Sequence, residues 1–201
     1  SVSPIVVDLD WRLDKNPGAH AYTRDQALAI VLALSKIAFR YIDTDSFTVY
    51  LMEKGPGARV EKKTHKDGLH IVVSNAVTIP DVQQRIRTRL LKVSSDITNN
   101  IQEIYDDSVI SRNGWLMYGS GKEEDTHVWT VTARLHVERS SMSLVHQEVP
   151  PFNSLVEELS IRYDLAPECK YTDAYHHEMQ SRDAQTSSNT WAHVPRSPNA
   201  G

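Results

Sequence analysis

The chain has little of several features that would define its class directly. It has one cysteine, Cys169, among 201 residues, which excludes an internal disulfide and argues against a cysteine-based zinc site. No apolar run approaches the ~20 residues that a membrane span needs, and the start lacks a signal-peptide pattern. The formal net charge of -4 gives no basic excess, so any nucleic-acid-binding surface must be local. We therefore predict a soluble, intracellular protein.

What is present is the composition of an ordinary globular protein, 40% hydrophobic and 24% charged. The length is sufficient for one domain with its own core, which we assign to residues 1–178. Residues 179–201 are rich in polar residues and have little to bury. We predict that they form a polar tail or linker.

Hydrophobic periodicity predicts several strands and two substantial helices. One helix begins after the N-cap Thr23 and ends near Tyr41, and the other begins at Pro80 and continues or restarts as far as Ile104. A short helix is expected at 153–159, and strands are expected at 6–12, 47–52, 69–73, 115–118 and 128–133. Strands that alternate with a few helices predict an α+β domain with helices packed on one face of a sheet.

The strand at 6–12 carries two acidic residues, Asp8 and Asp10. Side chains two positions apart on a strand point to the same face, so these carboxylates project together. Their repulsion and desolvation cost stability unless a cation lies between them, which predicts a divalent metal site. The alternative is a strand that runs out into a solvated, Asp-rich turn.

His70 lies inside an otherwise apolar strand and follows a locally basic stretch that includes Lys66. Basic side chains next to a histidine suit the oxygens of a polyphosphate. The alternative is a buried, hydrogen-bonded histidine on a strand whose charged approach is merely solvated.

A third segment begins with Asp106-Asp107 and ends, after an aromatic strand, in Gly119-Ser120-Gly121-Lys122. Glycines allow backbone N–H groups to approach phosphate, serine adds a donor, and lysine adds a charge. The spacing is not that of a P-loop, which excludes a Walker-type NTPase. A glycine-rich hairpin with an exposed lysine is the alternative.

In this order, the three segments resemble the archaeo-eukaryotic primase superfamily, in particular the primase domains of primase-helicases from large nucleocytoplasmic DNA viruses. Eukaryotic primase-polymerases are similar at a greater distance. The family pattern is hydrophobic-Asp-hydrophobic-Asp, then a small residue-x-His, then an Asp ahead of an aromatic strand that ends Tyr-x-Ser-x-Lys. Its counterparts here, over roughly residues 6–137, are Asp8-Leu9-Asp10, Gly68-Leu69-His70 and Tyr118-Gly119-Ser120-Gly121-Lys122.

The chain departs from the family pattern at two places. Gly68 stands where the family often has serine, so one hydroxyl contact to phosphate is missing. The third acidic residue is either Asp106 or Asp107, and we favour Asp106, because Val109 and Asn113 then align with the family's Val and Asn.

The resemblance implies a catalytic core with an RRM-like sheet, packed helices and a small accessory α/β unit. It implies a DNA-dependent nucleotidyltransferase that makes short primers on single-stranded DNA from NTPs or dNTPs, using two Mg2+ or Mn2+ ions. The metal ligands would be Asp8, Asp10 and Asp106, and the nucleotide contacts would be His70, Lys66, Lys122, Ser120, Arg112 and Asn113. A helicase region would follow on the same chain, at a viral replication site in the host cell.

Template binding has weaker candidates. Arg12 lies beside the metal strand, and Arg85, Arg89 and Lys92 share one face of the helix after Pro80. Such a stripe can follow a phosphate backbone, although a solvated helix face is the explanation we favour.

Two other functions were weighed. One is a non-catalytic nucleic-acid-binding module on the same fold. The other is a rolling-circle nuclease, which needs a His-hydrophobic-His pair; His176 and His177 are adjacent, so that pattern is absent.

Overall fold

The computed structural model describes residues 2–61, 64–111, 118–120, 127–159 and 167–189. Within these ranges the strands form one antiparallel sheet in the order β5-β1-β4-β2-β6-β7, and β3 pairs with β4. The strands are β1 Ser3–Leu13, β2 Ser46–Lys54, β3 Arg59–Glu61, β4 Thr64–Thr78, β5 Tyr105–Asp106, β6 Trp129–Glu138 and β7 Leu144–Gln147. The helices are α1 Arg24–Tyr41, α2 Pro80–Val93, α3 Ile101–Ile104, α4 Ser108–Ser111, α5 Phe152–Glu158 and α6 Asp173–Asn189.

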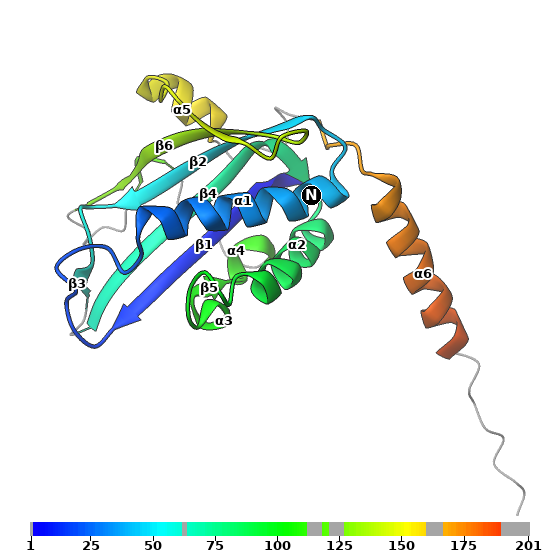
Figure 1. The fold of residues 1–201 in the computed structure, drawn as a ribbon, viewed down its shortest axis with the longest axis horizontal. Helices are drawn as coiled ribbons and strands as arrows, with labels where there is room; N and C mark the ends of the chain where they lie inside the picture. Colours follow the sequence, from blue (N-terminus) through cyan, green and yellow to red (C-terminus); the bar gives the residue numbers. More distant parts are fainter. Residues whose placement is uncertain (1, 62–63, 112–117, 121–126, 160–166, 190–201) are drawn as a thin grey trace, which may run out of the picture.

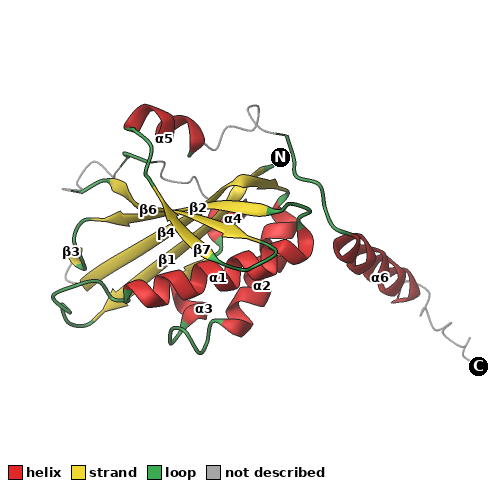
Figure 2. Ribbon diagram, turned by 45° about the horizontal axis from the view of Figure 1, so that its top comes forward, coloured by secondary structure: helices red, strands yellow, loops and turns green. Residues whose placement is uncertain are grey.

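The sheet has two different faces because successive side chains of a strand alternate. Val7, Leu9 and Ile71 point into the main core, beneath α1 and α2, which lie across this face in Figure 1. Val6, Tyr50, Met52 and Val72 point the other way and pack with Leu155 and Leu159, in and just after α5. Figure 2 shows α5 on the opposite side of the sheet from α1 and α2. The second face therefore has the smaller apolar cluster.

The start of α1 shows why this helix could be predicted. The Thr23 hydroxyl accepts a hydrogen bond from the backbone N–H of Gln26 at 3.1 Å, and the Gln26 side chain accepts one from the backbone N–H of Thr23 at 2.8 Å. This reciprocal capping box satisfies two N–H groups that would otherwise lack partners at the helix start. The predicted helix is confirmed.

Several predicted boundaries were wrong. β1 continues to Leu13, so Asp8 and Asp10 lie within the strand rather than at its end. Residues 59–61 form β3 and residues 64–67 form the start of β4, because charged side chains can extend a strand whose neighbours supply the hydrogen bonds. The helix from Pro80 ends at Val93 and a separate helix spans Ile101–Ile104, so of the two predicted alternatives the restart, and not the continuation, is confirmed. β7 was not predicted, and the strand expected at 115–118 lies outside the described residues.

The C-terminal region also differs from the prediction. α6, which was not predicted, extends to Asn189, so the first part of the segment predicted as a polar tail or linker is helical. Tyr175, which is 7% exposed, and Met179 pack against the main core and hold the start of this helix. In Figure 1 the rest of α6 points away from the sheet.

The predicted α+β class is confirmed, with helices and an antiparallel sheet in one unit. No second sheet occurs in the described ranges, so the accessory α/β unit is not distinguished there. Within the same ranges, no helix combines the length and the apolar character that a membrane crossing requires.

Candidate active site

The strand register brings the predicted acidic residues together. Asp8 on β1 lies directly opposite His70 on β4 and opposite Asp106 on β5, and Asp10 lies opposite Gly68. Residues directly opposite each other in an antiparallel pair point to the same face, with Cβ atoms about 5 Å apart. The carboxylates of Asp8, Asp10 and Asp106 therefore share one face with His70. This is the face that α1 and α2 leave uncovered.

Asp106 rather than Asp107 occupies the position opposite Asp8. Asp106 is the last residue of β5, and its Oδ1 accepts a hydrogen bond from the backbone N–H of Ser108 at 2.8 Å. Asp107 follows the strand and belongs to the turn before α4, where its carbonyl accepts a hydrogen bond from Ile110. The register therefore places Asp106 opposite Asp8, and its role as a metal ligand stays a prediction.

His70 is turned toward the first carboxylate. Its Nε2 lies 3.2 Å from Oδ1 of Asp8, and the residue is only 3% exposed. The imidazole stacks on the indole of Trp129, with ring centroids 3.4 Å apart and an angle of 16° between the planes. Because Trp129 covers one face of the ring, the orientation of Nε2 toward Asp8 is fixed by packing.

Trp129 also explains why position 68 is glycine here, where the family often has serine. A Cβ atom built on Gly68 would lie 2.8 Å from Cη2 of Trp129, which is closer than real contacts allow, and 3.4 Å from Oδ1 of Asp10. The serine that the family often has therefore does not fit beside this tryptophan. Sequence analysis missed Trp129, which comes from β6 and reaches across β2 to His70.

The charges of the site are electrostatically coupled. The pKa of Asp10 is raised, first by desolvation and then by the negative charges of Asp8 and Asp106, while His70 and Lys66 act to lower it. A raised carboxyl pKa means that the protein disfavours the charged form relative to water. A cation bound between these carboxylates would reverse that penalty.

Arg87 supports the short strand that carries Asp106. Its Nη2 donates a hydrogen bond to the carbonyl of Tyr105 at 3.1 Å, and its guanidinium lies 5.0 Å from the centroid of the Tyr105 ring. Tyr105 is buried and pairs with Leu9 of β1. Arg87 thus links α2 to the strand next to the site, a role that no sequence pattern indicated.

The remaining predicted nucleotide contacts divide into two groups. Lys66 lies on the same face as Gly68 and His70 by strand alternation, and Arg12 lies directly opposite Lys66. Ser120 lies beside Trp129, because its carbonyl accepts a hydrogen bond from the backbone N–H of Trp129 at 3.3 Å. Lys122, Arg112 and Asn113 fall outside the described residues.

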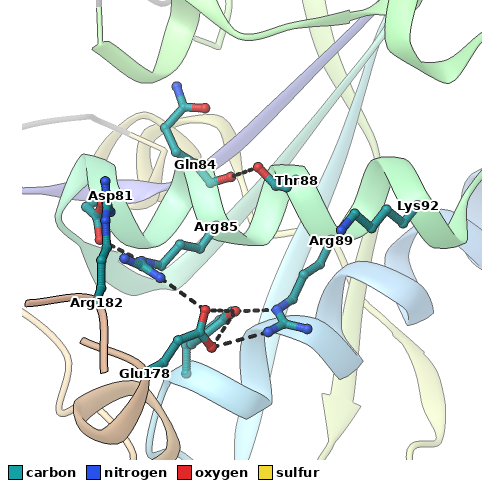
Figure 3. A pocket seen from close by; sticks show the side chains of 9 residues that line it. Asp81, Gln84, Arg85, Thr88, Arg89, Lys92, Glu178 and Arg182 are labelled. Carbon is teal, nitrogen blue, oxygen red and sulfur yellow. Dashed lines mark hydrogen bonds and ion pairs between the residues drawn. The ribbon is translucent and has the colours of Figure 1, made fainter. Parts of the chain in front are cut away.

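The arginine stripe on α2 is not part of this site. α2 packs on the opposite face of the sheet, where Figure 3 shows Arg85 and Arg89 directed at Glu178 of α6. Arg85 Nη1 lies 3.0 Å and Arg89 Nη2 3.2 Å from the Glu178 carboxylate. A pocket of about 460 Å3 is lined by these three residues together with Lys92 and Arg182. The predicted template contacts Arg85 and Arg89 therefore anchor α6, and Lys92 is separated from the carboxylates by the sheet.

The carboxylate oxygens of this face are possible ligands of a metal ion. In the described ranges, no three His, Cys, Asp or Glu side chains stand so that they could already hold an ion. The buried Asp67 accepts hydrogen bonds from the backbone N–H groups of Ala21 at 2.6 Å and Gly68 at 2.9 Å. Asp8 is 9% exposed, and among the described residues its buried Oδ1 accepts no comparable backbone hydrogen bond and lies close to His70. Oxygen donors of this kind suit Mg2+ and Mn2+, so the residues fit an ion that would draw the carboxylates together.

A comparison with known families identifies the domain. The family described as the C962R protein N-terminal AEP domain matches residues 1–135, from before β1 into β6. The chain belongs to the archaeo-eukaryotic primase superfamily. The matched part of this primase domain contains Asp8, Asp10, Asp106, His70 and Trp129. The family membership predicted from the sequence is confirmed.

One protein that is similar to this chain is much longer than it. The primase domain is 29% identical over 170 residues to a protein of Acanthamoeba polyphaga mimivirus that bears the name "Putative helicase L207/L206". The alignment covers 80% of this chain but only 17% of the viral protein. The chain therefore corresponds to a small part of that relative.

Proposed function

We propose that this primase-family domain is a DNA-dependent nucleotidyltransferase that makes short primers on single-stranded DNA. The observation that carries the proposal is the register of β1 with its two neighbours, which places Asp8 between His70 and Asp106 with Asp10 on the same face. Charged groups of this density on a sheet face cost stability, so a bound cation and substrate are their natural partners.

Asp8, Asp10 and Asp106 would hold two Mg2+ or Mn2+ ions. When bound, these ions supply activation of the attacking hydroxyl and stabilisation of charge on the transferred phosphate and leaving group. His70 orients Asp8 through Nε2 and contacts the incoming triphosphate, as the family pattern implies. Lys66 offers a positive charge to the same triphosphate from two positions beyond Gly68. Lys122, Ser120, Arg112 and Asn113 are proposed as further nucleotide contacts.

The larger assembly is part of the proposal. The mimivirus relative is named a helicase and is much longer than this chain, which supports a helicase region on the same full-length protein. The template would be single-stranded DNA, with Arg12 as a contact on the carboxylate face, and the setting would be viral DNA replication. Both NTPs and dNTPs are candidate substrates.

The first test removes one charge from the centre of the site. The 201-residue chain is incubated with single-stranded DNA, labelled nucleotides and Mn2+, and short products are resolved on a gel. We expect Asp8→Asn to lower primer synthesis by more than about a hundredfold, the loss typical when a preorganised electrostatic partner is removed. EDTA should abolish the activity of the unaltered chain. Asp96→Asn, which alters an exposed carboxylate after α2, is the matched control and should retain activity.

The same experiment distinguishes the alternative. If the unaltered chain binds single-stranded DNA but makes no product with either Mg2+ or Mn2+, the enzyme proposal is wrong. A non-catalytic nucleic-acid-binding module on the primase fold would then be the better description.

A further inference from the structure

One aromatic side chain in the described ranges is largely exposed to solvent. Phe152, the first residue of α5, is 57% exposed, whereas the other described Trp, Tyr and Phe side chains are buried or partly buried. Leu155 of the same helix is 2% exposed and packs on the sheet. α5 therefore buries one side and leaves Phe152 outside the core. Single exposed apolar side chains are ordinary, so the surroundings of Phe152 decide whether it marks a binding surface.

The ring of Phe152 is held in place by its neighbours. Its centroid lies 5.4 Å from that of Tyr118, with an angle of 45° between the planes. A Cβ atom built on Gly119 would lie 3.3 Å from Cε2 of Phe152, so the ring rests close to the glycine backbone. Pro150 and Pro151 come immediately before it, and each restricts its own φ. The exposed part of the ring is thus presented with little freedom to lose when a ligand binds.

The pair of Phe152 and Tyr118 is connected to the candidate active site through Trp129. The backbone N–H of Gly119 donates a hydrogen bond to the carbonyl of Trp129 at 3.0 Å. Tyr118 packs against the smaller apolar cluster, which includes Trp129, and Figure 2 shows α5 on the side of the sheet away from α1 and α2. The aromatic pair therefore shares a face with the carboxylates, next to the tryptophan that stacks on His70.

The distance between this pair and the carboxylates suits an extended single strand. β6 is three strands away from β1 in the order β1-β4-β2-β6, and Gly119 is bonded to β6 at Trp129. Neighbouring strands lie ~4.8 Å apart, so Gly119, one spacing further, is ~19 Å from the strand that carries Asp8. About six nucleotides span that distance at the ~3.4 Å rise of a stacked strand. A strand with one base at the carboxylates can therefore place another beside Phe152.

The charge of α5 limits how a nucleic acid could be held there. The helix contains Glu157 and Glu158 but no lysine or arginine. Glu158 accepts a hydrogen bond from the hydroxyl of Tyr50, and Glu157 is exposed. These carboxylates repel phosphates, so the contact on offer is with bases. Stacking on an aromatic ring is such a contact, and it tolerates any sequence because every base has a π face.

The small size of the surface favours a base over a protein. The exposed large hydrophobic residues in and just before α5 are Val149, Phe152 and Val156. A stable protein interface covers about 800 Å2 on each partner, which is far more than three side chains offer. A nucleobase, in contrast, is similar in size to the ring on which it stacks.

We propose that Phe152, backed by Tyr118, is a stacking platform for a base of the single-stranded DNA, an assignment that rests on the proposed nucleotidyltransferase function. The stacked base would lie about six nucleotides from the base being copied, outside the site of the incoming nucleotide. The family match ends at residue 135, so family membership does not assign this role to Phe152. The platform holds the strand at the edge of the carboxylate face whatever its sequence.

A binding test uses a labelled single-stranded oligonucleotide of about 16 nucleotides, measured by fluorescence anisotropy with Mg2+ and without nucleotides. We expect Phe152→Ala and Phe152→Leu to weaken binding about 5- to 100-fold, the loss that corresponds to one stacked base, and Phe152→Trp to keep the affinity. Leucine is apolar but has no ring, so it separates stacking from general apolar contact. Val156→Ala removes an exposed apolar side chain one turn further along α5 and is the matched control, with unchanged affinity expected.

A second binding test varies the DNA. Each oligonucleotide of a series carries one abasic site, at successive positions. We expect one or two positions at which the abasic site weakens binding of the unaltered chain but has no further effect on Phe152→Ala, because both changes remove the same contact. The salt dependence of the affinity should be equal in the two proteins, since stacking releases no counterions.

Several results would overturn the inference. They are undetectable binding of the oligonucleotides by the unaltered chain, unchanged affinity in Phe152→Ala and Phe152→Leu, and abasic effects that are the same with and without the ring. An equal loss in Val156→Ala would also count against stacking. Light scattering tests the protein alternative: a lower oligomer mass in Phe152→Ala at unchanged DNA affinity would make α5 a contact between copies of this chain.

The outcomes also separate the inference from the proposed function. If DNA affinity depends on the ring of Phe152 while the unaltered chain makes no primers, the platform stands and the polymerase function fails. If primers are made and the Phe152 variants bind DNA as the unaltered chain does, the platform fails alone.

Discussion

Trp129 contributes to the site in two ways at the scale of single residues. It stacks on His70 and so fixes the imidazole that faces Asp8. Its ring edge also occupies the space that a side chain at position 68 would need. The glycine and the tryptophan are therefore a matched pair, and the family's serine is incompatible with this arrangement.

This pairing predicts the effect of restoring the serine. Gly68→Ser should destabilise the fold by about 1–3 kcal/mol, the usual cost of forcing extra atoms into a packed site. Urea denaturation measures the change. In a double-mutant cycle with Trp129→Val, the serine should cost less than it does beside tryptophan, because the ring that it clashes with is gone. Additive effects of the two substitutions would contradict the explanation.

Some residues of this site could be predicted from the sequence and others could not, and the difference has a physical reason. Asp8 and Asp10 are two apart on one strand, so their common face follows from the period of a strand alone. His70 was found because it interrupts an apolar run. Trp129 acts through His70, which lies on another strand, and a cross-strand pairing is fixed by register, which no local period encodes.

At the scale of elements, the two-residue strand β5 depends on its support. Asp106 is held opposite Asp8 by a strand too short to be stable alone, and Arg87 of α2 binds the preceding residue, Tyr105. The position of the third carboxylate is thus controlled from a helix on the other side of the sheet.

Arg87→Ala should therefore act on catalysis through position rather than through contact. We expect primer synthesis to fall by about 10- to 100-fold, the range seen when a group that orients a metal ligand is lost. The Mn2+ concentration for half-maximal activity should rise, while single-stranded DNA affinity stays the same. Arg87→Lys should not rescue, because lysine cannot both stack on the ring and donate in the same geometry. Thr88→Ala, an exposed neighbour on α2, is the control, and normal Mn2+ dependence in Arg87→Ala would refute the positioning role.

The elements that sequence analysis found and missed differ in how they are stabilised. α1 and the long strands have strong apolar periods and, for α1, a capping box, so local pattern suffices. β5 has too few residues for any period to appear. α6 is polar along most of its length, and its docking depends on Glu178 between Arg85 and Arg89, which are distant in sequence.

At the scale of the whole molecule, the two faces of the sheet have separate tasks. One face is covered by α1 and α2, with α6 docked beyond them, and the other carries the carboxylates. Substitutions at the contact between α6 and α2 should therefore change the free energy of unfolding without changing the rate of primer synthesis.

Glu178→Gln tests this separation. Removing the carboxylate leaves Arg85 and Arg89 without their shared partner, and for a partly exposed network we expect a loss of about 1 kcal/mol, confined to α6 and its contacts. Amide hydrogen exchange should accelerate in residues 173–182 and not in β1 or β4. Primer synthesis should be unchanged, as it should be in the exposed control Glu157→Gln. A loss of activity would mean that α6 and the carboxylate face are coupled.

The place of Asp8 within the sheet has one more consequence. β1 is bonded to a neighbour on each side, and Asp8 lies at the point where both neighbours are paired. Fraying of β7, at the far edge, leaves the pairing of β1 with β4 intact, so Asp8, Asp10 and His70 stay together until the central sheet itself melts, whereas Asp106 depends on the edge strand β5. Of the three carboxylates, Asp106 is therefore the first that local unfolding would displace.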